Sequence, residues 1–144
     1  MDIARIIDLA AFDEHDCDLG TAGLCGMFAL ALFRAVITDR PQLVLIGSTN
    51  EGVPQRDRHG HLYWSHAAVE IAGRYYDIEG EQQRGWMFSN YVWSLPKGRE
   101  PAVIETTPGE FISEMRSTHT AVDRRQYIEW RDRLIKAAAT ISRR

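Results

Sequence analysis

The sequence predicts an α+β protein in which residues 1–144 form a single domain. A chain of this length is close to the commonest size of a domain with its own core. Strong helix formers at residues 24–37 are followed by a short apolar run at 42–47, and a candidate β-hairpin spans 61–80. Two helical patterns close the chain. We therefore expect a buried helix packed on a small antiparallel sheet, with C-terminal helices.

The first part of the chain divides into four segments. Residues 2–11 place apolar side chains at helical spacing and predict a short amphipathic helix. Residues 13–23 are acidic and are expected to be irregular. Residues 24–37 are apolar almost all the way round, so the predicted helix is buried on every side until residues 39–41 end it. Residues 42–47 then predict a central strand.

A loop and a hairpin are expected next. Residues 49–60 carry two glycines, a proline and several charges, which is typical of an exposed loop. The β-rich segments 61–71 and 74–80 are separated only by Ala72 and Gly73. Glycine accepts the positive φ of a tight turn, so the two segments predict a hairpin with a two-residue connection.

An aromatic-rich segment follows at residues 86–93. We expect it to cover the core or to form a surface for a partner. Its aromatic side chains are Trp86, Phe88, Tyr91 and Trp93.

Two helices are predicted at residues 108–117 and 121–142. Thr107 precedes a proline and, three residues on, Glu110, which is the pattern of a capped helix start. We expect His119, between the helices, to cap one of them or to be solvated. The last helix carries one apolar stripe, formed by Tyr127, Trp130, Leu134 and Ala138.

Charge and composition exclude several classes of partner. Seventeen basic and twenty acidic side chains give a net charge of −3, which offers no field to attract a phosphate backbone. We expect no nucleic-acid partner. The longest apolar run, residues 27–33, is far shorter than the roughly 20 residues that cross a bilayer, and no basic and hydrophobic leader opens the chain. We expect a cytoplasmic protein without a membrane partner; the oligomeric state stays open.

Cys25 begins the predicted buried helix. Unpaired N–H groups and the helix dipole favour a thiolate at such a position, and they can also hold an oxyanion. Gly26 follows, and its missing side chain would let a substrate approach the backbone. The alternative is that Cys25 is only a small apolar residue at a helix start, since free cysteine is commonly buried.

The hairpin supplies a histidine and a carboxylate. With a two-residue turn, opposed positions sum to 145, so Ala68 faces Asp77 and His66 faces Glu79. His66 and Asp77 then share a face as diagonal neighbours within hydrogen-bonding reach. In this arrangement a histidine activates a thiol while an acid fixes its tautomer. The alternative is a polar pair on a half-solvated sheet face.

These segments resemble the transglutaminase-like and papain-like cysteine superfamily. The matching pieces are GLCGMFALALFRAV around Cys25 and HAAVEIAGRYYDIEG from His66. The resemblance covers about residues 20–80 and implies a papain-like fold. It also implies Cys25 as nucleophile, His66 as general base and Asp77 as the orienting acid.

The sequence departs from the family pattern at three places. Ala68 stands where transglutaminase-like members usually have an aromatic residue, and Ile78 stands where a proline is frequent. The glutamine that papain-type enzymes place before the cysteine is replaced here by Asp18, Gly20 and Thr21. Thr21 and Gly26 are therefore our candidates beside the oxyanion.

Other candidate residues lie outside this set. Trp64 and Tyr63 are candidates for lining a substrate cleft, although aromatic residues on a strand also pack in the core. Cys17 lies in an expected loop between Asp16 and Asp18, whose charges raise the pKa of a thiol.

The sequence also contains a candidate metal cluster. A cluster formed by His15, Cys17, His59 and His61 matches no compact zinc spacing. We therefore assign no metal and no cofactor. A metal site that uses His59 and His61 stays an alternative.

The sequence thus predicts a thiol-dependent acyl-transfer enzyme with a Cys-His-Asp triad. It would be an amide or ester hydrolase, a deamidase or a transglutaminase-like enzyme, and its partner would be a protein, peptide or amide substrate. The alternative is a non-catalytic protein-interaction module that keeps the fold and binds through its aromatic and long-loop surface.

Overall fold

The computed structural model describes residues 1–91, 96, 99–118 and 121–142, so Trp93 and His119 lie outside the described residues. Within these ranges the chain is α+β, as the sequence predicts. Its elements are α1 (Ile3–Leu9), α2 (Glu14–Thr21), α3 (Cys25–Ala35), the 3-10 turn η1 (Ile37–Asp39), β1 (Gln42–Asn50), β2 (Val53–Pro54), β3 (Trp64–Ile71), β4 (Arg74–Asp77), β5 (Gly80–Gln82), α4 (Arg84–Tyr91), β6 (Glu100–Thr106), α5 (Pro108–Arg116) and α6 (Arg124–Ser142).

The sheet is antiparallel and is organised around β1. Strand β1 pairs with β3 on one edge and with β6 on the other, and β4 and β5 continue the sheet beyond β3. The short strand β2 pairs with the end of β1, at Thr49 and Asn50. The prediction of a central strand at residues 42–47 is therefore confirmed. Strand β6 was not predicted, and residues 49–60 belong in part to β1 and β2.

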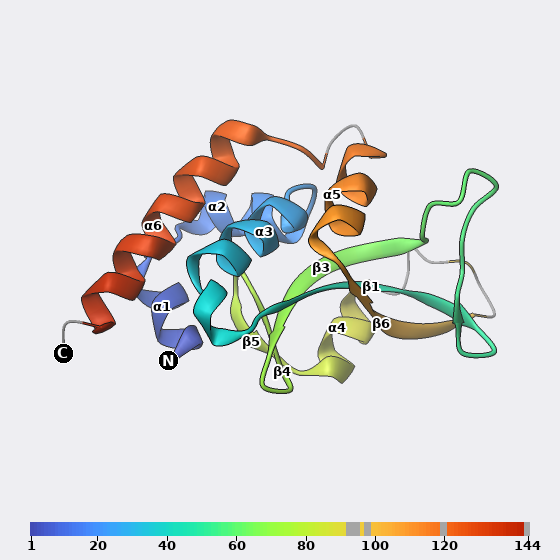
Figure 1. The fold of residues 1–144 in the computed structure, drawn as a ribbon, viewed down its shortest axis with the longest axis horizontal. Helices are drawn as coiled ribbons and strands as arrows, with labels where there is room; N and C mark the ends of the chain where they lie inside the picture. The colour runs from blue at the N-terminus through green and yellow to red at the C-terminus, as the bar shows by residue number, and fades with distance from the viewer. Residues whose placement is uncertain (92–95, 97–98, 119–120, 143–144) are drawn as a thin grey trace.

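Two cores lie on opposite faces of the sheet. Leu43 and Leu45 of β1 belong to the larger core, together with residues of α1, α3, α5 and α6. Val44 and Ile46, which alternate with them, pack with Met87 of α4 on the other face. Figure 1 shows α4 on the face of the sheet away from α3 and α6. Helix α3 is buried along almost its whole length, as expected from its sequence.

Helix α2 corrects the expectation of an irregular segment at residues 13–23. Asp13 caps the helix by accepting a hydrogen bond from the Asp16 backbone N–H, and the Asp16 carboxylate accepts one from the Asp13 backbone N–H. The Asp16 carboxylate also accepts hydrogen bonds from Trp130 Nε1 at 3.1 Å and Arg133 Nη1 at 2.9 Å. The local cap begins the helix, and these contacts with α6 hold it in place. Cys17 therefore lies on a helix and not in a loop.

Helix α5 begins at Pro108 as predicted, whereas α6 begins at Arg124, three residues later than predicted. Thr107 and Glu110 form the reciprocal cap at the start of α5. The apolar stripe predicted for α6 is buried against α3 and α1.

A helix can cross a membrane only if it is long and apolar enough. Among the described residues, no single helix is long and apolar enough, and only α2 and α3 taken together, across a bend of 104°, meet both criteria.

Candidate active site

The β3–β4 hairpin has the register expected from its turn. Ile71 pairs with Arg74 and Val69 with Tyr76, so opposed positions sum to 145. Ala72 and Gly73 both take positive φ, 51° and 79°, as a tight two-residue turn requires. Continuing this register places His66 and Asp77 on one face of the hairpin.

His66 and Asp77 form a buried hydrogen-bonded pair. His66 Nε2 lies 3.0 Å from Asp77 Oδ2, and the two residues are 0% and 2% exposed. The other carboxylate oxygen, Oδ1, accepts hydrogen bonds from the Glu79 backbone N–H at 2.9 Å and from Gln82 Nε2 at 3.2 Å. Both oxygens of Asp77 are therefore held, and the carboxylate fixes the orientation of the imidazole.

The second nitrogen of the imidazole faces a different environment. His66 Nδ1 is buried and makes no hydrogen bond within the described residues. Burial alone lowers the pKa of His66, but the hydrogen bond with Asp77 and the interactions with Cys25 outweigh it and raise the pKa to about 9. Cys25 therefore interacts with the imidazole, and Nδ1 is the ring nitrogen that Asp77 does not hold. These interactions favour the charged form of the imidazole.

Tyr91 of α4 covers the imidazole. Its ring stacks on that of His66 with centroids 3.7 Å apart and planes 1° from parallel. Burial raises the pKa of Tyr91, and the charges of Asp77, Glu79 and Cys25 raise it further, so the phenol stays neutral. The stacked ring keeps water from one face of the histidine.

Cys25 begins α3, as predicted. No side chain caps this helix, and its first hydrogen bond runs from the Phe28 N–H to the Leu24 carbonyl. The N–H groups of Cys25, Gly26 and Met27 precede that bond and are the unpaired groups of a helix start. They provide a positive electrostatic environment at the sulfur.

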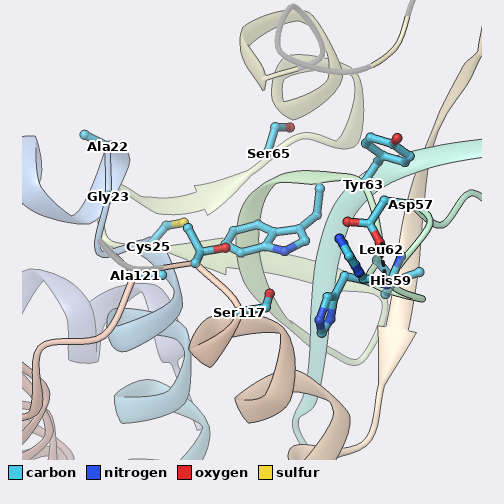
Figure 2. Close-up of a pocket in the computed structure, with 13 residues that line it drawn as sticks. Ala22, Gly23, Cys25, Asp57, His59, Leu62, Tyr63, Ser65, Ser117 and Ala121 are labelled. Atoms are coloured by element: carbon cyan, nitrogen blue, oxygen red, sulfur yellow. Dashed lines mark hydrogen bonds between the residues drawn. The ribbon is translucent and has the colours of Figure 1, made fainter.

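Cys25 lies at one end of an open cleft of about 480 Å³. The residue is only 3% exposed, but it contributes to the lining. Figure 2 shows Cys25 beside Gly23 and Ala121, while Asp57, His59 and Tyr63 lie at the opposite end. The cleft is lined by Ala22, Gly23, Cys25, Asp57, His59, His61, Leu62, Tyr63, Trp64, Ser65, Ser117, Thr118 and Ala121.

One wall of the cleft comes from residues 53–63, which we call the arm. It folds back on itself through a β-bridge between Arg56 and Leu62. The buried carboxylate of Glu114, on α5, accepts hydrogen bonds from the Leu62 backbone N–H, at 3.3 Å to each oxygen. Glu114 also lies 3.7 Å from His61 Nδ1 and 4.0 Å from Arg56 Nη1. The arm is thereby anchored to the helix whose end supplies Ser117 to the cleft.

Thr21 and Gly26, the two residues expected beside the oxyanion, are not among the residues that line the cleft. The Thr21 hydroxyl donates to the Cys17 carbonyl at 2.8 Å, and Ala22 and Gly23 line the cleft in its place. A Cβ atom on Gly26 would collide with Met115 Sδ. The open side of Gly26 is therefore filled by α5, so this glycine permits close helix packing and not the approach of a substrate. Only its backbone N–H stays a candidate for the oxyanion.

The other candidate residues lie in or near the cleft, except Cys17, which lies on α2. Trp64 is half-buried, packs against the larger core and also lines the cleft. His59 and His61 line the cleft, but no group of three potential metal ligands is found among the described residues. Burial raises the pKa of Cys17, and the charges of Glu79 and Asp16 add to the effect. The contribution of the arm and of Glu114 was missed, because it depends on contacts between distant segments.

Comparisons with known proteins gave no significant match. No protein-family model, no curated protein and no solved structure matches the chain. Its function must therefore be inferred from the chemistry of its own residues.

Proposed function

We propose that the chain is a thiol-dependent acyl-transfer enzyme of papain-like architecture, with Cys25 as nucleophile, His66 as acid and base, and Asp77 as the orienting carboxylate. The observation that carries this proposal is that the two nitrogens of the His66 ring have different surroundings. Nε2 is held by Asp77 at 3.0 Å, and Nδ1 has no other described partner while the Cys25 side chain lies beside the ring. A buried cation next to a thiol at a helix start favours the thiolate.

In the proposed reaction, the Cys25 thiolate attacks the carbonyl carbon of an amide or ester. The resulting oxyanion accepts hydrogen bonds from the free N–H groups at the start of α3. The His66 imidazolium gives its Nδ1 proton to the leaving nitrogen or oxygen, the bond to that atom breaks, and a thioester stays on Cys25. Water or an amine then attacks the thioester and gives a proton to Nδ1, and the thiolate leaves. The sequence needs no cofactor.

The size and lining of the cleft are consistent with a peptide or amide substrate. Its volume of about 480 Å³ falls within the usual range for small-molecule and peptide sites. It combines aromatic rings with the hydroxyl groups of Ser65 and Ser117. Hydrolysis, deamidation and transfer to an amine differ only in the second molecule that enters the cleft, so they share this machinery.

The test is the rate at which iodoacetamide alkylates Cys25 at pH 6, followed by peptide mass spectrometry. Cys17 is the internal control, because burial and nearby carboxylates raise its pKa. We expect Cys25 to react much faster than Cys17, and we expect His66→Ala to remove the difference. Equal, slow rates for both thiols in the unmodified protein would overturn the proposal.

The second candidate is a protein-interaction module that keeps this fold without catalysis. It is favoured by the low accessibility of Cys25, which is 3% exposed, and by the exposure of Trp86 on α4, which is 58% exposed. The module would show a slow Cys25 alkylation rate that His66→Ala leaves unchanged. The same experiment therefore separates the two candidates.

A further inference from the structure

The cleft carries a single carboxylate and no lysine or arginine, and its basic side chains are the imidazoles of His59 and His61. Of the thirteen residues that line it, Asp57 is the only acid, and none is a lysine or arginine. Figure 2 shows Asp57 at the end of the cleft opposite Cys25, with its carboxylate directed inward. A charged group of the substrate that reaches this end would therefore meet a negative charge.

Asp57 is held in place but is not neutralised. Its Oδ1 accepts hydrogen bonds from the backbone N–H groups of His59, at 2.8 Å, and His61, at 3.1 Å. Burial raises the pKa of Asp57, but the two backbone hydrogen bonds and the two nearby imidazoles together outweigh it and lower the pKa, so the group stays ionised. No salt bridge joins Asp57 to a basic side chain within the part of the chain that the structure describes.

The two arginines that flank Asp57 are directed elsewhere. Arg56 Nη1 donates to the Gly60 carbonyl at 2.8 Å and lies 4.0 Å from Glu114. Arg58 Nε donates to His59 Nε2 at 3.2 Å. The two arginines of the arm therefore bond to other groups and leave the Asp57 carboxylate for a ligand.

Aromatic rings line the same cleft. Tyr63, which is 36% exposed, and Trp64 both contribute to its wall. The face of an aromatic ring attracts an ammonium or guanidinium group, and a nearby carboxylate adds a charge-assisted hydrogen bond. Rings and a free carboxylate together form the chemistry that recognises a cation.

Resting on the proposed function, we propose that the enzyme prefers acyl donors that carry a lysine or arginine side chain, which is bound by Asp57 and by the rings of Tyr63 and Trp64. Asp57 is thus a specificity-determining residue at the end of the cleft remote from the sulfur. The scissile carbonyl lies at Cys25, and the cationic side chain extends along the cleft toward the arm.

The test uses tripeptidyl chloromethyl ketones, in which either lysine or norleucine occupies each position in turn. These reagents alkylate Cys25 with loss of chloride, and the two side chains differ mainly in the charge. At pH 7.5 and low salt, we expect the lysine reagent to react about tenfold faster than its norleucine counterpart at one position, from one ion pair and one cation–π contact. High salt should reduce this ratio, because the pair is solvent-exposed.

Asp57→Asn keeps an oxygen for the backbone N–H groups of the arm and removes the charge. We expect it to bring the lysine-to-norleucine ratio close to one, whereas Asp132→Asn, on the exposed face of α6, should leave the ratio unchanged. A ratio near one at every position in the unmodified protein would overturn this inference. Failure of the proposed function is seen separately, as slow and His66-independent reaction with iodoacetamide.

Discussion

Replacing Asp77 by asparagine removes a buried negative charge while keeping the size of the side chain. The Asp77 Oδ1 position receives two donors, the Glu79 N–H and Gln82 Nε2, so the asparagine oxygen has to stay there. The asparagine NH₂ group then faces His66 Nε2 and requires that nitrogen to accept a hydrogen bond. The neutral ring would carry its proton on Nδ1, which can no longer accept the proton of the thiol.

The size of the effect follows from the charge state of His66. Its pKa is raised from 6.5 to about 9 by the hydrogen bond with Asp77 and the interactions with Cys25, against the effect of burial. A return to the ordinary value removes roughly 3 kcal/mol of stabilisation from the imidazolium. At pH 7.5 the charged fraction would then fall from nearly all molecules to about one in ten.

The assay is the second-order rate constant for alkylation of Cys25 by iodoacetamide at pH 7.5. We expect Asp77→Asn to lower it on the order of tenfold, in proportion to the charged fraction of the imidazole. Glu81→Gln, which removes an exposed carboxylate from the neighbouring strand, is the matched control and should have little effect. If Asp77→Asn is folded by circular dichroism and alkylates at the unmodified rate, the reasoning from Asp77 to the thiol is refuted.

Three further predictions concern stability, measured by urea unfolding. Gly26→Ala should destabilise the fold by about 1–3 kcal/mol, since its Cβ would meet Met115. Gly85→Ala is the control and should be neutral or stabilising, since nothing lies within 4 Å of its Cβ. Equal free energies of unfolding for the two variants would contradict this packing. Glu114→Ala should lower the free energy of unfolding by about 1–3 kcal/mol because it leaves the buried Leu62 N–H unpaired, and Glu114→Gln should restore part of the loss. An unchanged urea midpoint in the alanine variant would show that the arm needs no anchor. Because the pKa of His66 in the folded protein is raised to about 9, the contribution of its charged form to the free energy of unfolding should be complete below about pH 6.5 and be lost toward pH 9. A stability difference between the unmodified protein and His66→Gln that is constant over this pH range would contradict this prediction.

The hairpin and its His66–Asp77 pair were accessible to sequence reasoning because they depend on local signals. A two-residue turn at Ala72 and Gly73 determines the register, and the register determines which side chains share a face. The buried character of α3 follows from its uninterrupted apolar sequence, and the start of α5 follows from the Thr107 cap.

The features that were missed depend on distant contacts. Helix α2 is held through Asp16 by Trp130, 114 residues away, and β6 forms by pairing with β1. The role of Gly26 is decided by Met115 of α5. The position of the arm depends on Glu114, 52 residues from Leu62. None of these pairs leaves a periodic or local pattern in the sequence, so only the folded arrangement reveals them.

The most direct measurement is the pH titration of the His66 ring nitrogens by nitrogen-15 NMR. If the imidazolium is held between a carboxylate and a thiol, both ring nitrogens should be protonated at pH 7.5 and the titration midpoint of His66 should lie near 9. The midpoint should be lower in Cys25→Ala. A neutral ring that titrates at or below 6.5, with no response to the loss of the sulfur, would contradict the catalytic pair.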